Sequence, residues 1–498
     1  MTKGYKGLLS MILILVFSIN TVMTAFATET NQAETEKELT EEEKIMQAEL
    51  EAAYKIPTES NSWEGWPKGP GTYGEAAIVM EADTGTILYA KDIDSKQYPA
   101  SITKVLTALI AFENGDFSDQ VTFSHDCVSF LQPGDSSVGL KEGNVITLEQ
   151  TLYATLLASA NEAAYAVGEN VGKNAGHDYN WFIDQMNERV KELGGVNSHF
   201  ANTNGLHDPD HYTCALDMAL VGSELFKHSE FFEIVQTLEY KIPESETVEE
   251  HVFQQKHKML KPNDPEYYKR VVGGKTGFTS DALSTLITMA DNGKMKLVCV
   301  VLRTHGKNVY PDTRNLLKYA FKNFKKVDLT KHMESADVAE VMTEEAGAKV
   351  PAVVIPKDAD FDSLDVEIVP DEADKTHGTV NYTYKGQDVG GAQVKFSDAY
   401  IAEHSPELLI TETENKEKDE PETSLTETES EEGQAEKAEG IERTVVVRVL
   451  DKLGVFDKSR TVQIILAAAS VLLVILVIAF VIMLIRLKIK RKRKRKRP

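Results

Sequence analysis

The chain has 498 residues, which is too long for one compact domain at about 150 residues per domain. Hydrophobic residues make up 42% of the chain and aromatic residues 8%, so a sizeable core can form and disorder throughout the chain is excluded. The 54 basic and 78 acidic side chains give a net charge of −24, which argues against nucleic acid as a partner.

Residues 1–27 have the layout of a secretory signal peptide. Lys3 and Lys6 form a positive start, residues 8–19 are an apolar run, and Ala25-Phe26-Ala27 is a small-x-small cleavage site. The alternative is an uncleaved N-terminal anchor, although the apolar run is short for a membrane span. We therefore expect the chain to be exported.

The next segment, residues 28–62, is expected to be an acidic and solvated spacer. Ten glutamates and three lysines lie between Thr28 and Ser60, and the apolar periodicity is weak. A short helix around Glu41–Tyr54 is compatible with the pattern.

Residues 63–328 alternate strand and helix patterns that predict one α+β domain. Strands occur at both ends of the segment with helices between them, so the terminal strands are expected to share a sheet. The predicted elements are a hairpin over Ala76–Ala90, helices over Ile102–Phe112, Leu148–Leu157 and Trp181–Leu193, strands over Leu283–Met289 and Met295–Leu302, and a helix around Thr313–Phe321.

Residues 335–400 change to short strands without long helices, which predicts a small all-β domain. Residues 411–440 hold twelve acids and three lysines with almost no large apolar side chains, so an acidic disordered linker is expected over residues 401–445. The predicted strands are Val350–Ile355, Leu364–Val369, Thr379–Tyr384 and Ala392–Phe396.

Residues 462–485 are predicted to be a transmembrane helix. The 22 residues from Ile464 to Ile485 contain no charge, and at 1.5 Å per residue they would span about 33 Å. Ten basic residues follow in 486–498, which the positive-inside rule makes a cytoplasmic tail. The expected location is therefore a single-pass protein of the cell membrane, in contact with the lipid bilayer through this helix and with everything before residue 462 outside.

The three cysteines, Cys127, Cys214 and Cys299, are an odd number in an exported chain. They argue against a disulfide framework, and none is part of a CxxC metal pair. We expect neither a metal nor a cofactor.

Ser101 and Lys104 are three residues apart where a helix is predicted to begin. Positions i and i+3 share a helix face, so the hydroxyl and the amine can meet. A lysine that burial keeps neutral can accept a serine proton. An N-capping serine beside a solvated lysine is the simpler reading of this pair alone.

Two further polar motifs lie downstream. Ser159 and Asn161 follow an apolar helix on a predicted loop, where a hydroxyl and an amide can relay a proton and orient a substrate amide. Lys275, Thr276 and Gly277 precede the second strand pair, and they could bind a carboxylate on a strand that a ligand can approach closely. Each motif is weak alone.

Together, SxxK, SxN and KTG in this order are the signature of penicillin-binding proteins and serine β-lactamases. The chain resembles the D-alanyl-D-alanine carboxypeptidases, the low-molecular-mass penicillin-binding proteins, strongly over about residues 74–324 and more weakly over the β domain. The segments that carry the resemblance are Tyr98–Lys104, Leu157–Ala164, Phe200–Leu206 and Gly274–Thr279.

The resemblance implies a transpeptidase-like fold of the penicillin-binding-protein and β-lactamase type, with an antiparallel sheet and a helical cluster. The small all-β domain, the acidic linker and the C-terminal membrane helix would follow it. The implied activity is that of a serine-type D-Ala-D-Ala carboxypeptidase, which removes the terminal D-alanine from peptidoglycan stem pentapeptides. β-Lactam antibiotics would be covalent inhibitors.

The same resemblance implies roles for individual residues. Ser101 would be the nucleophile and Lys104 the general base. Ser159 and Asn161 would assist proton transfer and hold the peptide. The remaining substrate-binding residues would be Lys275 and Thr276 for the terminal carboxylate, Gly277 beside them, and Phe278, whose backbone N–H would join that of Ser101 in the oxyanion hole.

Some positions depart from the family pattern. Ala282-Leu283 replaces the usual Ala-Gly pair, and Ala160-Asn161-Glu162 follows Ser159 where Gly-Asn-Asp is usual. An arginine often seen after the last strand has no clear counterpart. The residues near its place are Tyr310, Arg303 and Arg314.

The sequence also bears on four alternative functions. A β-lactamase of this type needs a Glu-x-x-x-Asn segment between the second and third motifs, and no asparagine between residues 162 and 274 has a glutamate four residues earlier. A D,D-endopeptidase on the same fold and a catalytically silent wall-binding scaffold stay open. His207-Asp-Pro-Asp-His211 could offer metal ligands, but it reads more simply as a loop.

Overall fold

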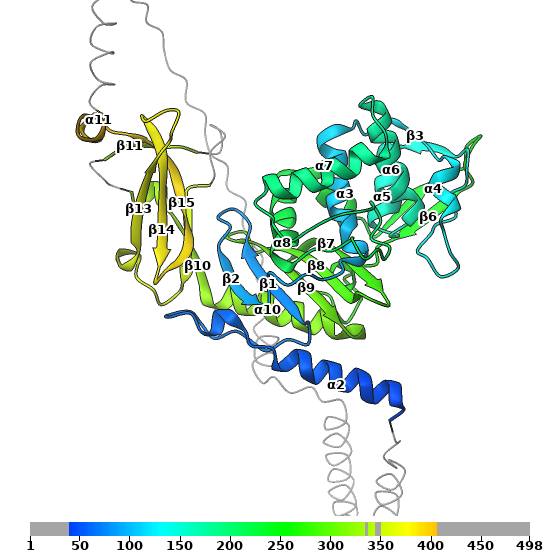
Figure 1. The fold of residues 1–498 in the computed structure, drawn as a ribbon, viewed down its shortest axis with the longest axis horizontal. Helices are drawn as coiled ribbons and strands as arrows, with labels where there is room; N and C mark the ends of the chain where they lie inside the picture. The colour runs from blue at the N-terminus through cyan, green and yellow to red at the C-terminus, as the bar shows by residue number, and fades with distance from the viewer. Residues whose placement is uncertain (1–38, 334–336, 344–349, 406–498) are drawn as a thin grey trace, which may run out of the picture. The chain divides into compact units, whose positions relative to one another are not determined.

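The computed structural model describes residues 39–333, 337–343 and 350–405. Its first sheet is antiparallel, with the strand order β2-β1-β9-β8-β7 (Figure 1). Because β1 pairs with β9 along its whole length, the prediction that strands from both ends of the segment share a sheet is confirmed. The strands are β1 (Ala76–Glu81), β2 (Ile87–Lys91), β7 (Val271–Thr279), β8 (Leu283–Asp291) and β9 (Lys296–Thr304).

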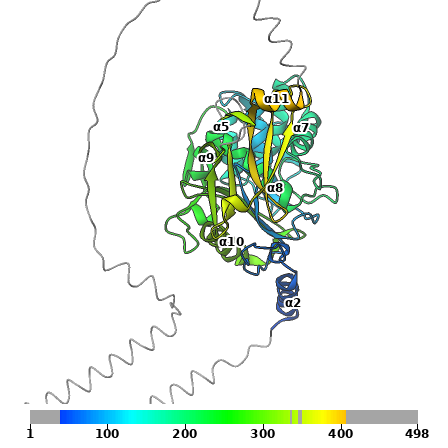
Figure 2. The same ribbon diagram turned by 90° about the vertical axis from the view of Figure 1, so that its left-hand side faces the viewer.

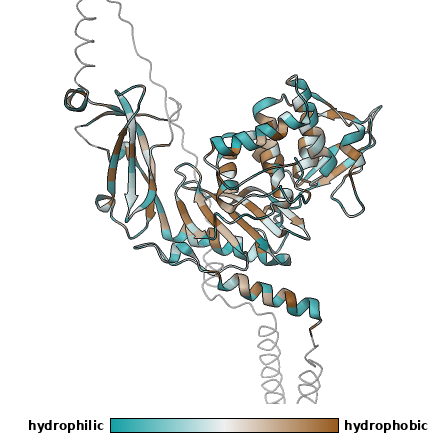
Figure 3. Ribbon diagram, viewed as in Figure 1, coloured by the Kyte–Doolittle hydropathy of each residue, from teal (hydrophilic) through white to brown (hydrophobic). Residues whose placement is uncertain are grey.

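This sheet is buried on both faces. Ile78 and Met80 of β1 pack in one hydrophobic cluster with α8 (Ala215–Glu224). Ala77 and Val79 pack in a second cluster with α10 (Val309–Asn323). Successive side chains of a strand point to opposite faces, so an uninterrupted apolar strand serves both layers. Figure 3 shows the hydrophobic colour along these strands.

The remaining helices of this domain join the first of these clusters, on the α8 side of the sheet (Figure 1). Thr147 and Gln150 form the predicted capping box at the start of α5. Helices predicted at three places are confirmed here, whereas α4, α6, α8 and α9 were not predicted. The helices are α3 (Thr103–Asn114), α4 (His125–Ser129), α5 (Leu148–Leu156), α6 (Asn161–Asn174), α7 (Tyr179–Glu192) and α9 (Ser229–Gln236).

Part of the expected spacer is folded onto this domain. α2 (Glu41–Lys55) occupies the place of the short helix that the sequence allowed. Nζ of the buried Lys91 donates at 2.8 Å to the carbonyl of Ala53, in the last turn of α2. Nε2 of His305 also lies 2.5 Å from Oε2 of Glu49 in the same helix. A cation at a helix C-terminus is favourable, so residues 41–55 are attached rather than free in solvent.

The second sheet has the order β10-β12-β15-β14-β13, and β11 also pairs with β15. It confirms the four strands predicted in residues 335–400. β10 also belongs to this sheet, although the predicted boundary at residue 328 assigned it to the first domain. The strands are β10 (Phe324–Asp328), β11 (Val338–Val341), β12 (Ala352–Pro356), β13 (Asp365–Pro370), β14 (His377–Tyr384) and β15 (Gln387–Phe396).

A short helix, α11 (Asp398–His404), lies at one end of the second sheet (Figure 2). Tyr400 of α11 stacks on Phe396 of β15, with ring centroids 4.2 Å apart. Ile401 is also buried, so the expected linker 401–445 begins with residues that belong to the folded domain.

The predicted signal peptide (1–27), membrane helix (462–485) and basic tail (486–498) lie outside the described residues, as does the linker beyond residue 405. Within the described part of the chain, no helix has the length and apolar character needed to span a membrane.

Candidate active site

The structure brings Ser101 and Lys104 together at the start of α3. Ser101 lies in the 3-10 turn Ala100–Ile102, and Lys104 lies in the first turn of the α-helix that follows. Nζ of Lys104 is 3.1 Å from Oγ of Ser101. Lys104 is fully buried and Ser101 is partly exposed, so a ligand can reach the hydroxyl but solvent does not reach the amine.

Two oxygen acceptors hold the other side of the Lys104 amine. It donates to Oδ1 of Asn161 at 2.8 Å and to the backbone carbonyl of Asn204 at 2.5 Å. Burial, reinforced by the nearby charges of Lys275 and Lys256, holds the pKa of Lys104 well below its ordinary value. A neutral amine has two N–H groups and one lone pair. With both N–H groups on these oxygens, the lone pair is left for the Ser101 hydroxyl proton.

Ser159 and Asn161 lie on the turn that joins α5 to α6. Ser159 has φ +62°, a left-handed conformation that is uncommon for a residue with a side chain and often marks a functional turn. α5 ends at Leu156, and Asn161 begins α6 two residues after Ser159. The turn therefore directs Asn161 to Lys104 while Ser159 faces β7.

Lys275 lies in β7 and is buried, with 2% of its surface exposed. Its Nζ donates to Oγ of Ser159 at 2.9 Å and to the carbonyl of Thr276 at 2.9 Å. Burial, and then the charge of Lys256, lowers the pKa of Lys275 to about 7. A lysine that is cationic below this pKa and lies beside a serine hydroxyl is suited to receive an anionic group.

The strand that carries Lys275 runs directly against the turn that carries Ser101. A Cβ atom at Gly277 would lie 2.3 Å from Oγ1 of Thr285 and 3.0 Å from the backbone nitrogen of Ser101, so only glycine permits this approach. Thr285 in turn donates to the carbonyl of Pro99 at 2.8 Å. Phe278, the next residue, is 67% exposed at this edge.

Sequence reasoning assigned no role to three residues that the structure places at this site. The buried Glu162 accepts bonds from Ser137, Val138 and Gly139, and so holds that loop beside Asn161. Lys256 lowers the pKa of both site lysines, and Asn204 offers its backbone carbonyl. Asn204 and Glu162 lie in segments that carried the family resemblance. The acceptor at Asn204 is a backbone carbonyl, which every residue has, so the residue type could not reveal it.

A residue in the left-handed conformation also precedes Ser101. Ala100 has φ +51°, and Gly205 has φ +80°. A Cβ atom at Gly205 would lie 1.9 Å from the Ala100 carbonyl oxygen, so the Phe200–Leu206 turn packs its backbone directly on the residue before Ser101.

The structure shows the conformation and the contacts of the residues that depart from the family pattern. Leu283 has φ +53°, a conformation that glycine adopts more easily, and it is partly exposed. Tyr310 is buried and packs beside Lys258 and His257. Arg303 donates to Glu75 and to the Asp281 carbonyl, and Arg314 donates to Glu266, so both are bonded away from Lys275.

The His207–His211 segment does not form a metal site. His211 is buried, and its two ring nitrogens are used by Thr103 and Ala201. His207 instead lies against Tyr98, with ring centroids 4.7 Å apart.

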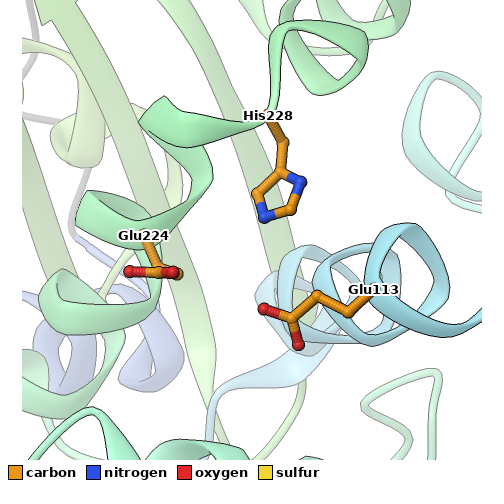
Figure 4. A group of neighbouring side chains, drawn as sticks. All are labelled: Glu113, Glu224 and His228. Carbon is orange, nitrogen blue, oxygen red and sulfur yellow. The ribbon is translucent and has the colours of Figure 1, made fainter. Parts of the chain in front are cut away.

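In the described part of the chain, one group of side chains has metal-ligand spacing, namely Glu113, Glu224 and His228 (Figure 4). Arg189 donates to Glu113 at 2.8 Å and to Glu224 at 2.9 Å. Nζ of Lys227 also lies 2.8 Å from Oε2 of Glu224. Both carboxylates therefore already have cationic partners, and we assign no metal to this group.

The comparisons with known proteins agree with one another. Residues 67–306 match the family model of the D-alanyl-D-alanine carboxypeptidases. The chain is 30% identical over 267 residues to the D-alanyl-D-alanine carboxypeptidase DacF of Bacillus subtilis. This match covers 52% of this chain and 65% of DacF. It is 29% identical over 274 residues to DacA of Escherichia coli, covering 53% of this chain and 64% of DacA. The matches thus span slightly less than two thirds of the length of these relatives.

Among solved structures, the Streptomyces K15 DD-transpeptidase is similar with a TM-score of 0.47 and 25% sequence identity. The match covers 51% of this chain and 100% of that protein.

Proposed function

Because residues 67–306 belong to the D-alanyl-D-alanine carboxypeptidase family, we propose that this protein is a serine-type D-Ala-D-Ala carboxypeptidase that acts through an acyl-enzyme on Ser101. The observation that carries the proposal is the bonding of Lys104. Its amine is buried, is shifted toward the neutral form and touches Ser101 Oγ, which is what a general base for this hydroxyl requires.

In the proposed reaction, Ser101 Oγ attacks the carbonyl carbon of the penultimate D-alanine and its proton passes to Lys104. The backbone N–H groups of Ser101 and Phe278 would stabilise the oxyanion, in agreement with the close approach of Gly277 to the Ser101 nitrogen. Lys275 and Thr276 would bind the terminal carboxylate. The terminal D-alanine leaves with a returned proton, and water then hydrolyses the ester.

The proposed substrate is the peptidoglycan stem pentapeptide, and β-lactams would acylate the same serine. The predicted signal peptide and membrane helix would place the site on the wall side of the membrane. This location rests on sequence patterns alone.

The test uses the full-length protein in detergent. We expect it to release D-alanine from a pentapeptide ending in D-Ala-D-Ala and to form a covalent adduct with a fluorescent penicillin, and we expect Ser101→Ala to do neither. Cleavage of cross-linked peptide dimers in preference to the pentapeptide would identify an endopeptidase instead. A wild-type protein that forms no adduct would exclude acyl transfer on this serine.

The pKa of Lys275 predicts the pH dependence of acylation. Lys275, with a pKa of about 7, is cationic below that pH and neutral above it, so binding of a penicillin carboxylate weakens as pH rises. We expect the second-order acylation rate constant to fall above about pH 7, by up to about 10-fold per pH unit. Stopped-flow measurement from about pH 6 to about pH 9 checks this.

The methyl ester of the same penicillin is the control, since it carries no carboxylate for Lys275. Its rate constant is expected to lack the alkaline fall. An equal fall for acid and ester would show that Lys275 does not bind the carboxylate.

A further inference from the structure

Behind the nucleophile lies a chain of buried hydrogen bonds that the proposed reaction does not use. Nε2 of His211 is 2.8 Å from Oγ1 of Thr103, and Thr103 donates to the carbonyl of Ala100 at 2.9 Å. On its other side, the His211 ring accepts at Nδ1 from the backbone N–H of Ala201 at 3.0 Å. Thr103 is fully buried, and His211 is 2% exposed.

The chain of bonds has one direction. Ala201 contributes an N–H, which can only donate, so Nδ1 of His211 must be the unprotonated nitrogen. Nε2 therefore carries the hydrogen and donates to Thr103, whose own hydroxyl hydrogen is then directed to Ala100. Burial lowers the pKa of His211 to about 3, so the ring stays neutral and keeps this arrangement at physiological pH.

The chain ends on a strained residue. Ala100 is left-handed, and its carbonyl oxygen lies against Gly205. That carbonyl belongs to the peptide bond whose nitrogen is the N–H of Ser101, the group assigned to the oxyanion hole. Its orientation therefore sets where that N–H points.

We propose that His211 is a positioning residue for the reaction at Ser101, acting through Thr103 and Ala100. The inference rests on the proposed function, because it concerns the geometry of the same acylation. It assigns the second histidine of the 207–211 segment to orientation of the nucleophile turn, in place of metal binding.

The expected consequence is specific to the chemical step. In His211→Phe, which keeps the aromatic volume but has no hydrogen-bonding nitrogen, we expect the maximal acylation rate by penicillin to fall about 10-fold or more. The dissociation constant of the non-covalent complex should change by less than about 3-fold, since Lys275 and Ser159 are untouched. If His211 were a core residue with no positioning role, His211→Phe would lower thermal stability without a selective loss in the maximal acylation rate.

Two substitutions distinguish the hydrogen bond to Thr103 from the hydrogen bond to Ala201. His211→Gln can still present an N–H to Thr103 and is expected to recover most of the acylation rate. His211→Asn, whose shorter amide reaches Ala201 but not Thr103, is expected to remain slow. The control is His199→Phe, which removes a bond to the Asp210 carbonyl of the same loop and should acylate normally.

A double-mutant cycle with Thr103→Val tests the path. If His211 acts through Thr103, the double variant is no slower than Thr103→Val alone. The proposal is overturned if His211→Phe acylates at the wild-type rate, or if the two losses multiply. These results require an active wild-type protein, so failure of the wild type to form an adduct identifies failure of the proposed function itself and removes this inference with it.

Discussion

Replacing Lys104 by methionine is expected to slow acylation of Ser101 by about 10²–10⁴-fold, the range typical for loss of a positioned general base. Methionine fills a similar volume but cannot accept the Ser101 proton, and the lysine side chain that it replaces is fully buried. The measurement is the rate of adduct formation with a fluorescent penicillin, together with the thermal unfolding midpoint.

Loss of the amine also leaves the Asn161 amide oxygen and the Asn204 carbonyl without their donor. This costs about 1–3 kcal/mol of folding stability for each oxygen that stays buried and unpaired. Lys104→Arg is a second test, because a guanidinium remains protonated and should be equally slow.

The chain offers a matched control in Lys91. This lysine is also fully buried, but its Nζ bonds to oxygens of Ala53, Thr72 and Gly74. Lys91→Met is expected to lower stability and to leave the acylation rate of the folded protein unchanged. Equal slowing in both variants would attribute the effect to general damage and contradict the assignment of Lys104 as base.

Substituting Gly205 by alanine is expected to disable the site through a backbone clash. The new Cβ would lie 1.9 Å from the Ala100 carbonyl oxygen and 2.4 Å from its carbon, and neither atom can move without shifting the turn that carries Ser101. A displacement of about 1 Å at a reacting group can cost about 10²-fold in rate. We therefore expect acylation to slow by at least that factor, or the protein to unfold at a clearly lower temperature.

Gly293→Ala separates the clash from simple backbone strain. Gly293 has φ +78°, close to the +80° of Gly205, but no atom lies within 4 Å of the position that a Cβ would occupy there. Its alanine variant should lose only the roughly 1–2 kcal/mol of a left-handed conformation. Similar behaviour of the two variants would show that the contact with Ala100 is unimportant.

The chemistry of the site could be predicted where it depends on local spacing. Ser101 and Lys104 are three residues apart on a helical turn, and this spacing alone brings their side chains to one face. The hairpin around Asp83-Thr84-Gly85 and the capping box at Thr147 also follow from short-range rules. The resemblance to a known family then gave the three weak motifs a single combined interpretation.

Other helices and boundaries escaped the local patterns. α6 contains Gly168, Asn170 and Gly172, residues that are poor helix formers, and tertiary packing keeps it helical. The pattern allowed the helix α2, but its glutamates suggested a solvated spacer, whereas its attachment depends on a lysine 38 residues away in sequence.

The sequence alone places a serine hydroxyl, an amine three residues later and a lysine before the second strand pair in the order that a known enzyme family uses. Only the tertiary structure lowers the pKa of that amine well below its ordinary value. Its acceptors, Asn161 and Asn204, are 57 and 100 residues away, and the burial that shifts its pKa is produced by packing of distant segments. Local spacing can predict which side chains share a helical turn, but desolvation depends on every segment that surrounds them.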